Sequence, residues 1–512
     1  MNVQANPKVK IMKKTTKLKT VLLLAVLFCN TILMAQAPAV AWQKCIGTTG
    51  SEVVKSFQRT ADGGYIMAGT IGTYGYYNYY IVKLDASGTV QWEKSIGDES
   101  DDQALSIKQT TDGGYIVLGD SRRTYSSLGT YRGFWIIKLD ASGEQQWETA
   151  IGGGGLGMTE NTYDIQLTTD GGYVFTGIKA FTGKGQDFYI AKLNSTGAII
   201  WQKNYGGPAD DYVNSIRQTT DGGYVVAGQT YSNSGDVTGQ HGNGDFWIIK
   251  LNALGELEWQ KALGGTGVDF ASTIELTADG GYIAAGFASS NSGDVSGVYG
   301  NADFWIVKLS SAGTIQWQKA YGGDNSDKVS SIKPTLDGGY IVAGRTNSNN
   351  SGYITGHHGS GLDVWIVKIN SLGVFQWQKT LGGFSDDTAS EIIQNSDGSY
   401  TIAGITFSND GDVSGNHGSA DIWLVNLFPE VLASETFNEK TAVIYPNPVT
   451  NILKIQIPGT IQKIVIFDTT GKKIAEQNSD SNQVDVAGLQ RGMYTIRIQT
   501  SGKMITQKFI KE

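Results

Sequence analysis

Hydrophobic and polar residues alternate with a period of two along most of the chain, in short runs separated by glycine-rich turns. Residues 206–261 show this most clearly, with alternating runs at 215–219, 224–227, 246–251 and 257–261. A period of two is typical of β-strands, and glycine supplies the positive φ that a tight hairpin turn needs. The pattern therefore predicts four short antiparallel strands in this segment.

The same segment recurs along the chain, and an Asp-Gly-Gly-Tyr or Asp-Gly-Ser-Tyr turn marks each copy. The marker tyrosines are separated by 50, 58, 51, 58, 58 and 60 residues, and they are Tyr65, Tyr115, Tyr173, Tyr224, Tyr282, Tyr340 and Tyr400. Repeats of this length, each with four strands, are typical of β-propellers. We therefore predict an all-β fold in which residues 38–427 form a seven-bladed β-propeller.

The two ends of the repeat array are out of phase. The array begins near Trp42 with a lone fourth strand and ends at Leu427 directly after a third strand. A closed ring has no free strand edges, and the N-terminal strand can supply the one that the last blade lacks. We expect residues 42–45 to pair with residues 421–427.

Each repeat also carries residues that recur at fixed places in the predicted strands. The third strand has a lysine in six repeats, for which we expect a structural ion pair because an unpaired buried charge is costly; these are Lys83, Lys138, Lys192, Lys250, Lys308 and Lys368. The turn that follows, Lys-Leu-Asp-Ala-Ser-Gly-Thr-Val-Gln-Trp at 83–92, resembles the tryptophan-docking motif of quinoprotein propeller repeats. This resemblance implies a scaffold role and does not by itself imply a bound quinone.

The N-terminal residues 1–37 have the composition of a signal peptide. Six lysines and no acidic residue precede a short apolar run at 21–28, and Ala-Gln-Ala follows at 35–37. We expect export, and no apolar run is long enough for a transmembrane anchor. The formal net charge of −8 becomes more negative once these lysines are removed, which disfavours nucleic acid as a partner.

An acidic residue stands thirteen positions before every marker tyrosine. The set is Glu52, Asp102, Glu160, Asp211, Asp269, Asp327 and Asp387. If the first strand is innermost, these carboxylates lie at the mouth of a central channel, where they could bind a cation such as calcium. The alternative is a structural role in which each carboxylate accepts hydrogen bonds from its own loop or pairs with the lysine of the third strand.

The loops between the second and third strands differ from repeat to repeat. The last four contain an Asn-x-Gly-x-x-x-Gly sequence, at 233–239, 291–297, 350–356 and 409–415. Three of these loops also contain the four histidines of the chain, one or two per loop, to which we assign turn or surface roles. The first three loops instead contain aromatic and basic residues, which favour a binding surface for a glycan or a protein. The predicted contact residues are Tyr74, Tyr76, Tyr77, Arg122 and Tyr131.

The sequence contains no recognisable constellation of catalytic residues. There is no histidine beside a candidate nucleophile and no phosphate-binding loop, and we predict neither a metal centre nor a cofactor, apart from the calcium alternative above. A binding or adhesion protein is therefore the preferred hypothesis. An extracellular polysaccharide hydrolase or lyase with its site on the same face, and a purely structural surface protein, remain as alternatives.

After a linker at 428–442, residues 443–512 resemble the type A C-terminal sorting domain of the type IX secretion system of Bacteroidota. The residues that carry this resemblance are Tyr445, Pro446, Asn447, Pro448, Gly471, Lys472, Gly492 and Tyr494. The resemblance implies a small β-sandwich that the type IX secretion machinery recognises. It also implies passage through the periplasm to the cell surface or the medium.

Overall fold

The computed structural model describes residues 36–73, 76–97, 101–125, 129–152, 160–180, 185–430, 443–456, 461–468, 472–478, 481–500 and 504–512. The predicted signal peptide lies outside the described residues except for its last two positions. The described residues form β-strands and no helix.

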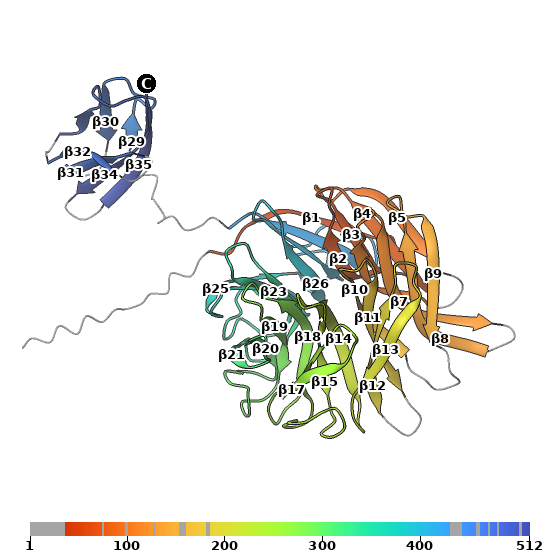
Figure 1. The fold of residues 1–512 in the computed structure, drawn as a ribbon. Helices are drawn as coiled ribbons and strands as arrows, with labels where there is room; N and C mark the ends of the chain where they lie inside the picture. The colour runs from red at the N-terminus through yellow and green to blue at the C-terminus, as the bar shows by residue number, and fades with distance from the viewer. Residues whose placement is uncertain are drawn as a thin grey trace, which may run out of the picture. The chain divides into compact units, whose positions relative to one another are not determined.

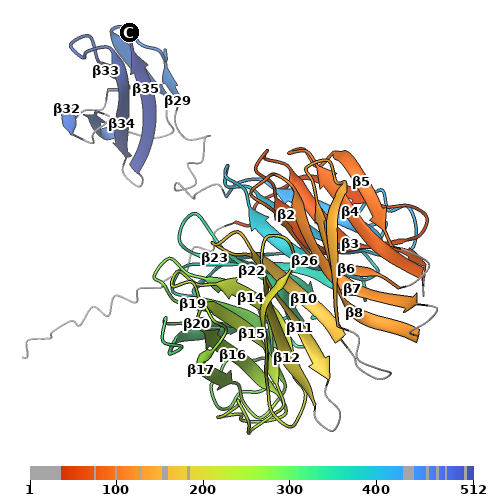
Figure 2. The ribbon, with the colours of Figure 1, turned by 45° about the vertical axis from the view of Figure 1, so that its right-hand side comes forward.

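The strands up to residue 427 form seven four-stranded antiparallel sheets (Figures 1 and 2). Six of these sheets each consist of four strands that are consecutive in the chain. The first sheet contains β2 (Ser51–Arg59), β3 (Tyr65–Thr73), β4 (Tyr76–Leu84) and β5 (Val90–Ile96); the second contains β6 (Gln103–Gln109), β7 (Tyr115–Tyr125), β8 (Gly129–Leu139) and β9 (Gln145–Gly152); and the third contains β10 (Glu160–Leu167), β11 (Tyr173–Ala180), β12 (Gln186–Leu193) and β13 (Ile199–Tyr205). The fourth sheet contains β14 (Asp211–Gln218), β15 (Tyr224–Thr230), β16 (Asp245–Leu251) and β17 (Leu257–Leu263); the fifth contains β18 (Asp269–Leu276), β19 (Tyr282–Ala288), β20 (Asp303–Leu309) and β21 (Ile315–Tyr321); and the sixth contains β22 (Asp327–Pro334), β23 (Tyr340–Thr346), β24 (Asp363–Ile369) and β25 (Phe375–Leu381).

The remaining sheet joins the two ends of the array. It consists of β26 (Asp387–Gln394), β27 (Tyr400–Thr406), β28 (Asp421–Leu427) and β1 (Val40–Ile46), in the order β1-β28-β27-β26. Cys45 lies opposite Trp423, and the Trp423 indole N–H donates to Gln43 Oε1 at 2.8 Å. The N-terminal strand thus completes the last sheet, as the phase offset predicts.

The first strands of the seven sheets meet around a common centre. Each contacts the next in the order β2, β6, β10, β14, β18, β22 and β26, and β26 contacts β2 in turn. Every one of these strands carries a β-bulge near its middle, which bends the strand. The predicted all-β propeller is confirmed.

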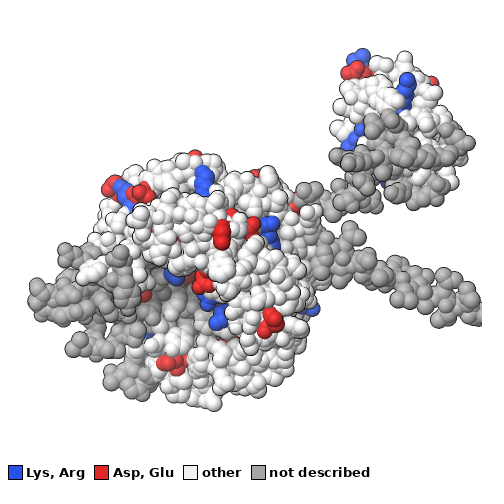
Figure 3. All heavy atoms as spheres, turned by 180° about the vertical axis from the view of Figure 1, so that it is seen from behind, with Lys and Arg blue, Asp and Glu red and all other residues white. Residues whose placement is uncertain are grey.

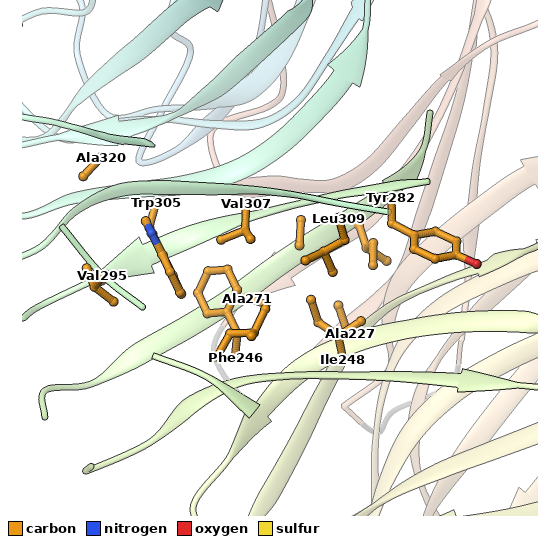
Figure 4. Close-up of a cluster of buried hydrophobic side chains, with 14 of the residues drawn as sticks. Ala227, Phe246, Ile248, Ala271, Tyr282, Val295, Trp305, Val307, Leu309 and Ala320 are labelled. Carbon is orange, nitrogen blue, oxygen red and sulfur yellow. The ribbon is translucent and has the colours of Figure 1, made fainter. Parts of the chain in front are cut away.

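The hydrophobic core lies between neighbouring sheets. Third strands are buried on both faces, as in β16 and β20, and Phe246 packs against Trp305 across one junction with 4.5 Å between ring centroids (Figure 4). On the fourth strands, a tryptophan reaches the turn of the following sheet. A Cβ on Gly88 would lie 2.8 Å from the ring of Trp42, so only glycine fits beneath the indole.

The C-terminal residues form two smaller sheets. One contains β29 (Val443–Tyr445), β30 (Ile452–Gln456) and β33 (Gln483–Asp485), and the other contains β31 (Ile461–Phe467), β32 (Lys473–Gln477), β34 (Gly492–Thr500) and β35 (Met504–Lys511). Side chains from both sheets share one buried core that includes Leu453, Ile464, Ile496 and Phe509. This arrangement agrees with the expected β-sandwich.

Candidate functional site

Each sheet of the propeller has two edges with different connections. At the turn edge lie the tight turns from first to second and from third to fourth strand, and at the loop edge lie the longer connections from second to third strand and from one sheet to the next. Because neighbouring strands are antiparallel, the two kinds of connection at each edge face the same way. Functional residues can therefore be assigned edge by edge.

At the turn edge, the lysines of the third strands form the expected ion pairs. Lys308 Nζ lies 2.9 Å from Asp279 Oδ2 and also donates to the Leu309 carbonyl oxygen at 3.1 Å. Partial burial would raise the pKa of Asp279, but hydrogen bonds from Lys308 and Thr277 outweigh it and lower the pKa to about 2. The partner is the aspartate of the Asp-Gly-Gly-Tyr turn, and the six pairs are Lys83–Asp62, Lys138–Asp112, Lys192–Asp170, Lys250–Asp221, Lys308–Asp279 and Lys368–Asp337.

At the loop edge, the predicted acidic residues lie at or next to the start of the first strands, and the six whose side chains are described do not line the central cavity. Six of the seven are fully buried: Glu52, Asp102, Asp211, Asp269, Asp327 and Asp387. The side chain of Glu160 lies outside the described residues. Asp211 shows the common arrangement, since its carboxylate accepts the Gly207 N–H at 2.8 Å and the Ser232 hydroxyl at 3.0 Å. Contacts within the entering loop thus agree with the structural alternative.

A second buried carboxylate stands next to this first one at several junctions. Asp303, the first residue of β20, is fully buried, and its Oδ2 accepts the Tyr299 N–H at 2.7 Å. Asp303 Oδ1 and Asp327 Oδ2 lie 2.3 and 2.7 Å from the position that a Cβ on Gly322 would take. Burial and, to a smaller extent, the charge of Asp327 together raise the pKa of Asp303 to about 6, against the effect of that hydrogen bond. The repeat therefore holds carboxyl groups in pairs that do not ionise easily.

Three of the four histidines contact these aspartates of the third strands. Nδ1 of His241 lies 2.8 Å from Asp245, Nδ1 of His358 lies 3.1 Å from Asp363, and Nδ1 of His417 lies 2.7 Å from Asp421. The loop histidines therefore have a structural partner that spacing alone did not reveal. Among the residues that the structure describes, no three His, Cys, Asp or Glu side chains are grouped so that they could hold a metal ion.

The centre of the propeller contains a chain of ion pairs that the sequence analysis missed. Arg217 lies 2.7 Å from both Asp164 and Glu275, and Lys333 lies 2.6 Å from Glu275 and 3.0 Å from Glu391. The five residues come from five successive first strands with alternating charge, and Glu391 accepts the Phe57 N–H at 3.0 Å. Burial alone would raise the pKa of Glu275, but the charges of Arg217 and Lys333 lower it. Arg217, Glu275 and Lys333 stand seven positions before their marker tyrosines, whereas Asp164 and Glu391 stand nine positions before theirs. No single repeat position therefore shows the alternating charge in the sequence.

These ion pairs nearly fill the central channel. The remaining cavity has a volume of about 100 Å³ and is lined by serines and by the charged groups, so it has room for a few water molecules at roughly 30 Å³ each. Figure 3 shows acidic and basic side chains gathered around a hollow on one face. A ligand larger than a few water molecules must therefore bind outside this cavity.

The predicted contact residues of the first two repeats are only partly described. Tyr76 is 66% exposed at the start of β4, and Tyr77 next to it is partly exposed, with its carbonyl oxygen accepting the Asp102 N–H at 2.8 Å. Tyr74 lies outside the described residues. Arg122 and Tyr131 lie on the long hairpin of β7 and β8, opposite Arg132 and Arg123, and their side chains are not described. The structure thus places four of the five at the loop edge of two neighbouring sheets.

Other exposed aromatic side chains at the loop edge were not predicted. Tyr231 and Phe407 directly follow second strands, Tyr299 lies in a loop between second and third strands, and Phe384 lies between two sheets; their exposed fractions are 40%, 49%, 69% and 65%. At the turn edge, the large exposed side chains include Leu254, Leu336 and Leu372. Most of the exposed aromatic side chains named here thus lie at the loop edge, while Phe428, which is 53% exposed, follows β28 at the turn edge.

In the C-terminal sheets, several residues of the predicted sorting motif have clear structural roles. Asn447 Oδ1 accepts the Ile510 N–H at 2.8 Å, and its Nδ2 donates to the Lys508 carbonyl oxygen at 3.2 Å, which fixes the Tyr-Pro-Asn-Pro segment to β35. Tyr494 stacks on Phe509 with 5.6 Å between centroids. Lys472 N–H donates to Asp468 Oδ1 at 3.0 Å, while Gly471 lies outside the described residues.

Comparison with known families supports both parts of this description. Residues 443–512 match the family described as the secretion system C-terminal sorting domain. The chain carries a type IX secretion sorting domain. Residues 77–247 and 132–303 each match the family described as outer membrane protein assembly factor BamB, in agreement with the PQQ-like repeats of the propeller. The sorting domain directs the protein to the cell surface or the medium.

Individual relatives are distant. The chain is 25% identical over 215 residues to the regulatory protein FlaEY of Caulobacter vibrioides, a match covering 38% of this chain and 22% of that protein. A solved protein of unknown function from Dyadobacter fermentans matches at a TM-score of 0.43 and 10% identity, covering 76% of this chain and 99% of that one. PorZ of Porphyromonas gingivalis, a surface component of the type IX secretion system, matches at a TM-score of 0.25 and 9% identity, covering 94% and 86%. These likenesses carry no argument about function.

Within the described residues, no helix has the length and apolar character needed to cross a membrane.

Proposed function

We propose that this exported propeller is an extracellular binding protein whose loop edge binds a glycan. One observation carries the proposal: exposed aromatic rings occur at the loop edge of several sheets, at Tyr76, Tyr231, Tyr299, Phe384 and Phe407. Exposed aromatic residues of this kind are the usual anchors of binding surfaces. Tyr74, Tyr77, Arg122 and Tyr131 belong to the same proposed surface.

The scaffold supports this assignment because it leaves the loop edge free to vary. The Asp–Lys pairs stabilise the turn edge, and the docked tryptophans stabilise the junctions between sheets. The ion pairs around Arg217 stabilise the centre. Loops on a rigid scaffold tolerate substitution and commonly carry recognition residues. Tyr76 and Phe384 can therefore change without loss of the core.

The experiment is a screen of the exported protein against a glycan array, followed by titration of the strongest glycan. Tyr76→Ala and Phe384→Ala should each weaken binding by about 1–2 kcal/mol, the usual loss on truncating a contact residue, with unchanged melting temperatures. Leu254→Ala is the matched control because Leu254 is also 66% exposed but lies at the turn edge. Binding to no glycan on the array, or equal weakening by the control, would contradict the proposal.

A further inference from the structure

Three cationic side chains near the loop-edge end of the central channel have no counter-ion among the described residues. They are Lys55 on β2, Lys328 on β22 and Arg345 on β23, and none makes an ion pair or a side-chain hydrogen bond with any described residue. The cations deeper in the channel differ, since Lys108, Arg217 and Lys333 each lie within 4.0 Å of a carboxylate. The unpaired state is thus a local property of this cluster.

The strand register makes the cluster unfavourable for folding. Lys328 and Arg345 lie directly opposite each other in the β22–β23 pair, where two like charges destabilise a sheet. In the flanking sheets the same positions hold Phe270 opposite Phe287 and Thr388 opposite Ile405. A repulsive pair therefore stands where the two flanking sheets place neutral residues.

The three cations also act on one another. Loss of hydration, and then the charge of Arg345, lowers the pKa of Lys55, and the same two causes lower the pKa of Lys328. The charge of Arg345 thus acts on both lysines, and Lys328 is the one that lies directly opposite it in the strand register. Because the chain as a whole is acidic, with a formal charge of −8, this concentration of positive charge is not a general property of its surface.

An aromatic surface adjoins the cations. The rings of Phe270 and Phe287 are stacked, with centroids 5.6 Å apart and planes inclined by 18°, and Lys328 Nζ lies 4.5 Å from the centre of the Phe287 ring. Both rings are partly exposed. A flat apolar surface beside unpaired cations matches a ligand that has both an apolar face and an anionic group.

We propose that Lys55, Lys328 and Arg345 bind the anionic group of an acidic saccharide, carboxylated or sulfated, whose sugar ring lies against Phe270 and Phe287. This inference rests on the proposed glycan-binding function and moves its centre from the first two sheets to the sheets of β18 and β22. The saccharide lies at the mouth of the channel because Lys55 lines the central cavity, which is too small to admit a sugar. An anion there relieves the repulsion among the three cations.

The test is a titration of the exported full chain with three oligosaccharide probes: tetragalacturonate, its fully methyl-esterified form, and a sulfated galactose tetrasaccharide. The charged probes should bind at least tenfold more tightly than the ester, with the stronger of the two identifying the anionic group. Arg345→Met and Lys328→Met should remove this preference without lowering the melting temperature, and Arg345→Lys should restore part of it. Lys203→Met, at an exposed site on β13, is the control and should bind like the wild type.

The outcomes separate the two proposals. If the ester binds as tightly as the charged probes, or if Arg345→Met and Lys328→Met keep the preference, the cation cluster is not the binding site, while glycan binding at the loop edge stands. If neither the three probes nor any glycan on the array binds, both proposals are overturned.

Discussion

The two edges of the propeller use the same residue, aspartate, in opposite ways. At the turn edge the aspartate is half exposed and paired with a buried lysine, and these contacts lower the pKa of Asp221 and Asp279 to about 2. At the loop edge the aspartate is fully buried, and burial raises the pKa of Asp269 and Asp303 to about 6. One edge gains stability from its charges, whereas the other keeps its carboxyl groups at a cost when they ionise.

Breaking an ion pair at the turn edge should have the largest effect. Asp279→Asn leaves Lys308 buried without its carboxylate, and the free energy of unfolding should fall by about 3–5 kcal/mol. Lys308→Met removes the charge and leaves Asp279 half exposed to water, so its loss should be clearly smaller. Urea denaturation of both variants at pH 7 measures the two free energies of unfolding. Equal losses would show that the buried charge of Lys308 does not depend on the Asp279 carboxylate for its stabilisation.

Removing a charge at the loop edge should instead stabilise the protein. The pKa of Asp303 is about 6 in the folded protein and about 4 in an unfolded chain. The folded state therefore holds the proton more tightly, and stability falls as the pH rises from about 4 to about 6. Asp303→Asn should be more stable than the wild type at pH 8, by about 2–3 kcal/mol, and no more stable below pH 4.

Denaturant titrations at pH 4, 6 and 8 test this sign. Asp279 provides the contrast because its pKa is lowered, so its contribution is complete above about pH 4 and is lost as the pH falls toward 2. If Asp303→Asn is less stable than the wild type at pH 8, then contacts in the folded protein offset the cost of burying the Asp303 charge. The two edges would then not differ in the effect of their charges on stability.

A pair of glycine substitutions should give the smallest contrast. Gly313 at the turn edge and Gly239 at the loop edge have φ values of +75° and +83°, but a Cβ on Gly313 would lie 3.0 Å from the Trp259 ring, whereas a Cβ on Gly239 meets nothing within 4 Å. Gly239→Ala should cost about 1 kcal/mol of backbone strain, and Gly313→Ala about 1–3 kcal/mol more through overpacking against the indole. Thermal unfolding of both variants measures the two losses of stability. Equal losses would show that the docked tryptophan does not restrict the residue at the turn edge.

The sequence predicted the features that depend on neighbouring residues. Alternation of apolar residues, the Asp-Gly-Gly-Tyr turns and the phase offset of Trp42 and Leu427 predicted the strands, the turns and the closing strand. It did not predict the contacts between charged side chains of neighbouring sheets. Arg217 meets Glu275 and Asp164 only because their strands adjoin in space, and Asp303 meets Asp327 for the same reason.

For the candidate site, the sequence predicted an aromatic surface around Tyr76 and its neighbours but could not weigh one loop against another. Exposure of Tyr299 and Phe384 depends on how each loop folds over its sheet, which residue identity does not determine. The opposition of Lys328 and Arg345 depends on register, and one residue of slip would have placed a neutral side chain there.

The closing strand links the order of synthesis to the order of export. Gln43 and Trp423, joined by a hydrogen bond, are 380 residues apart in the chain, so ring closure must wait until nearly the whole propeller sequence has left the ribosome. The sorting domain begins at residue 443, only shortly after the last strand of the ring. A chain whose sorting domain is available for recognition therefore already contains every strand of the propeller. A prematurely terminated chain lacks both the closed ring and the sorting domain. The contact that is slowest to form, because it spans the longest loop, thus comes just before the signal that commits the protein to leave the cell.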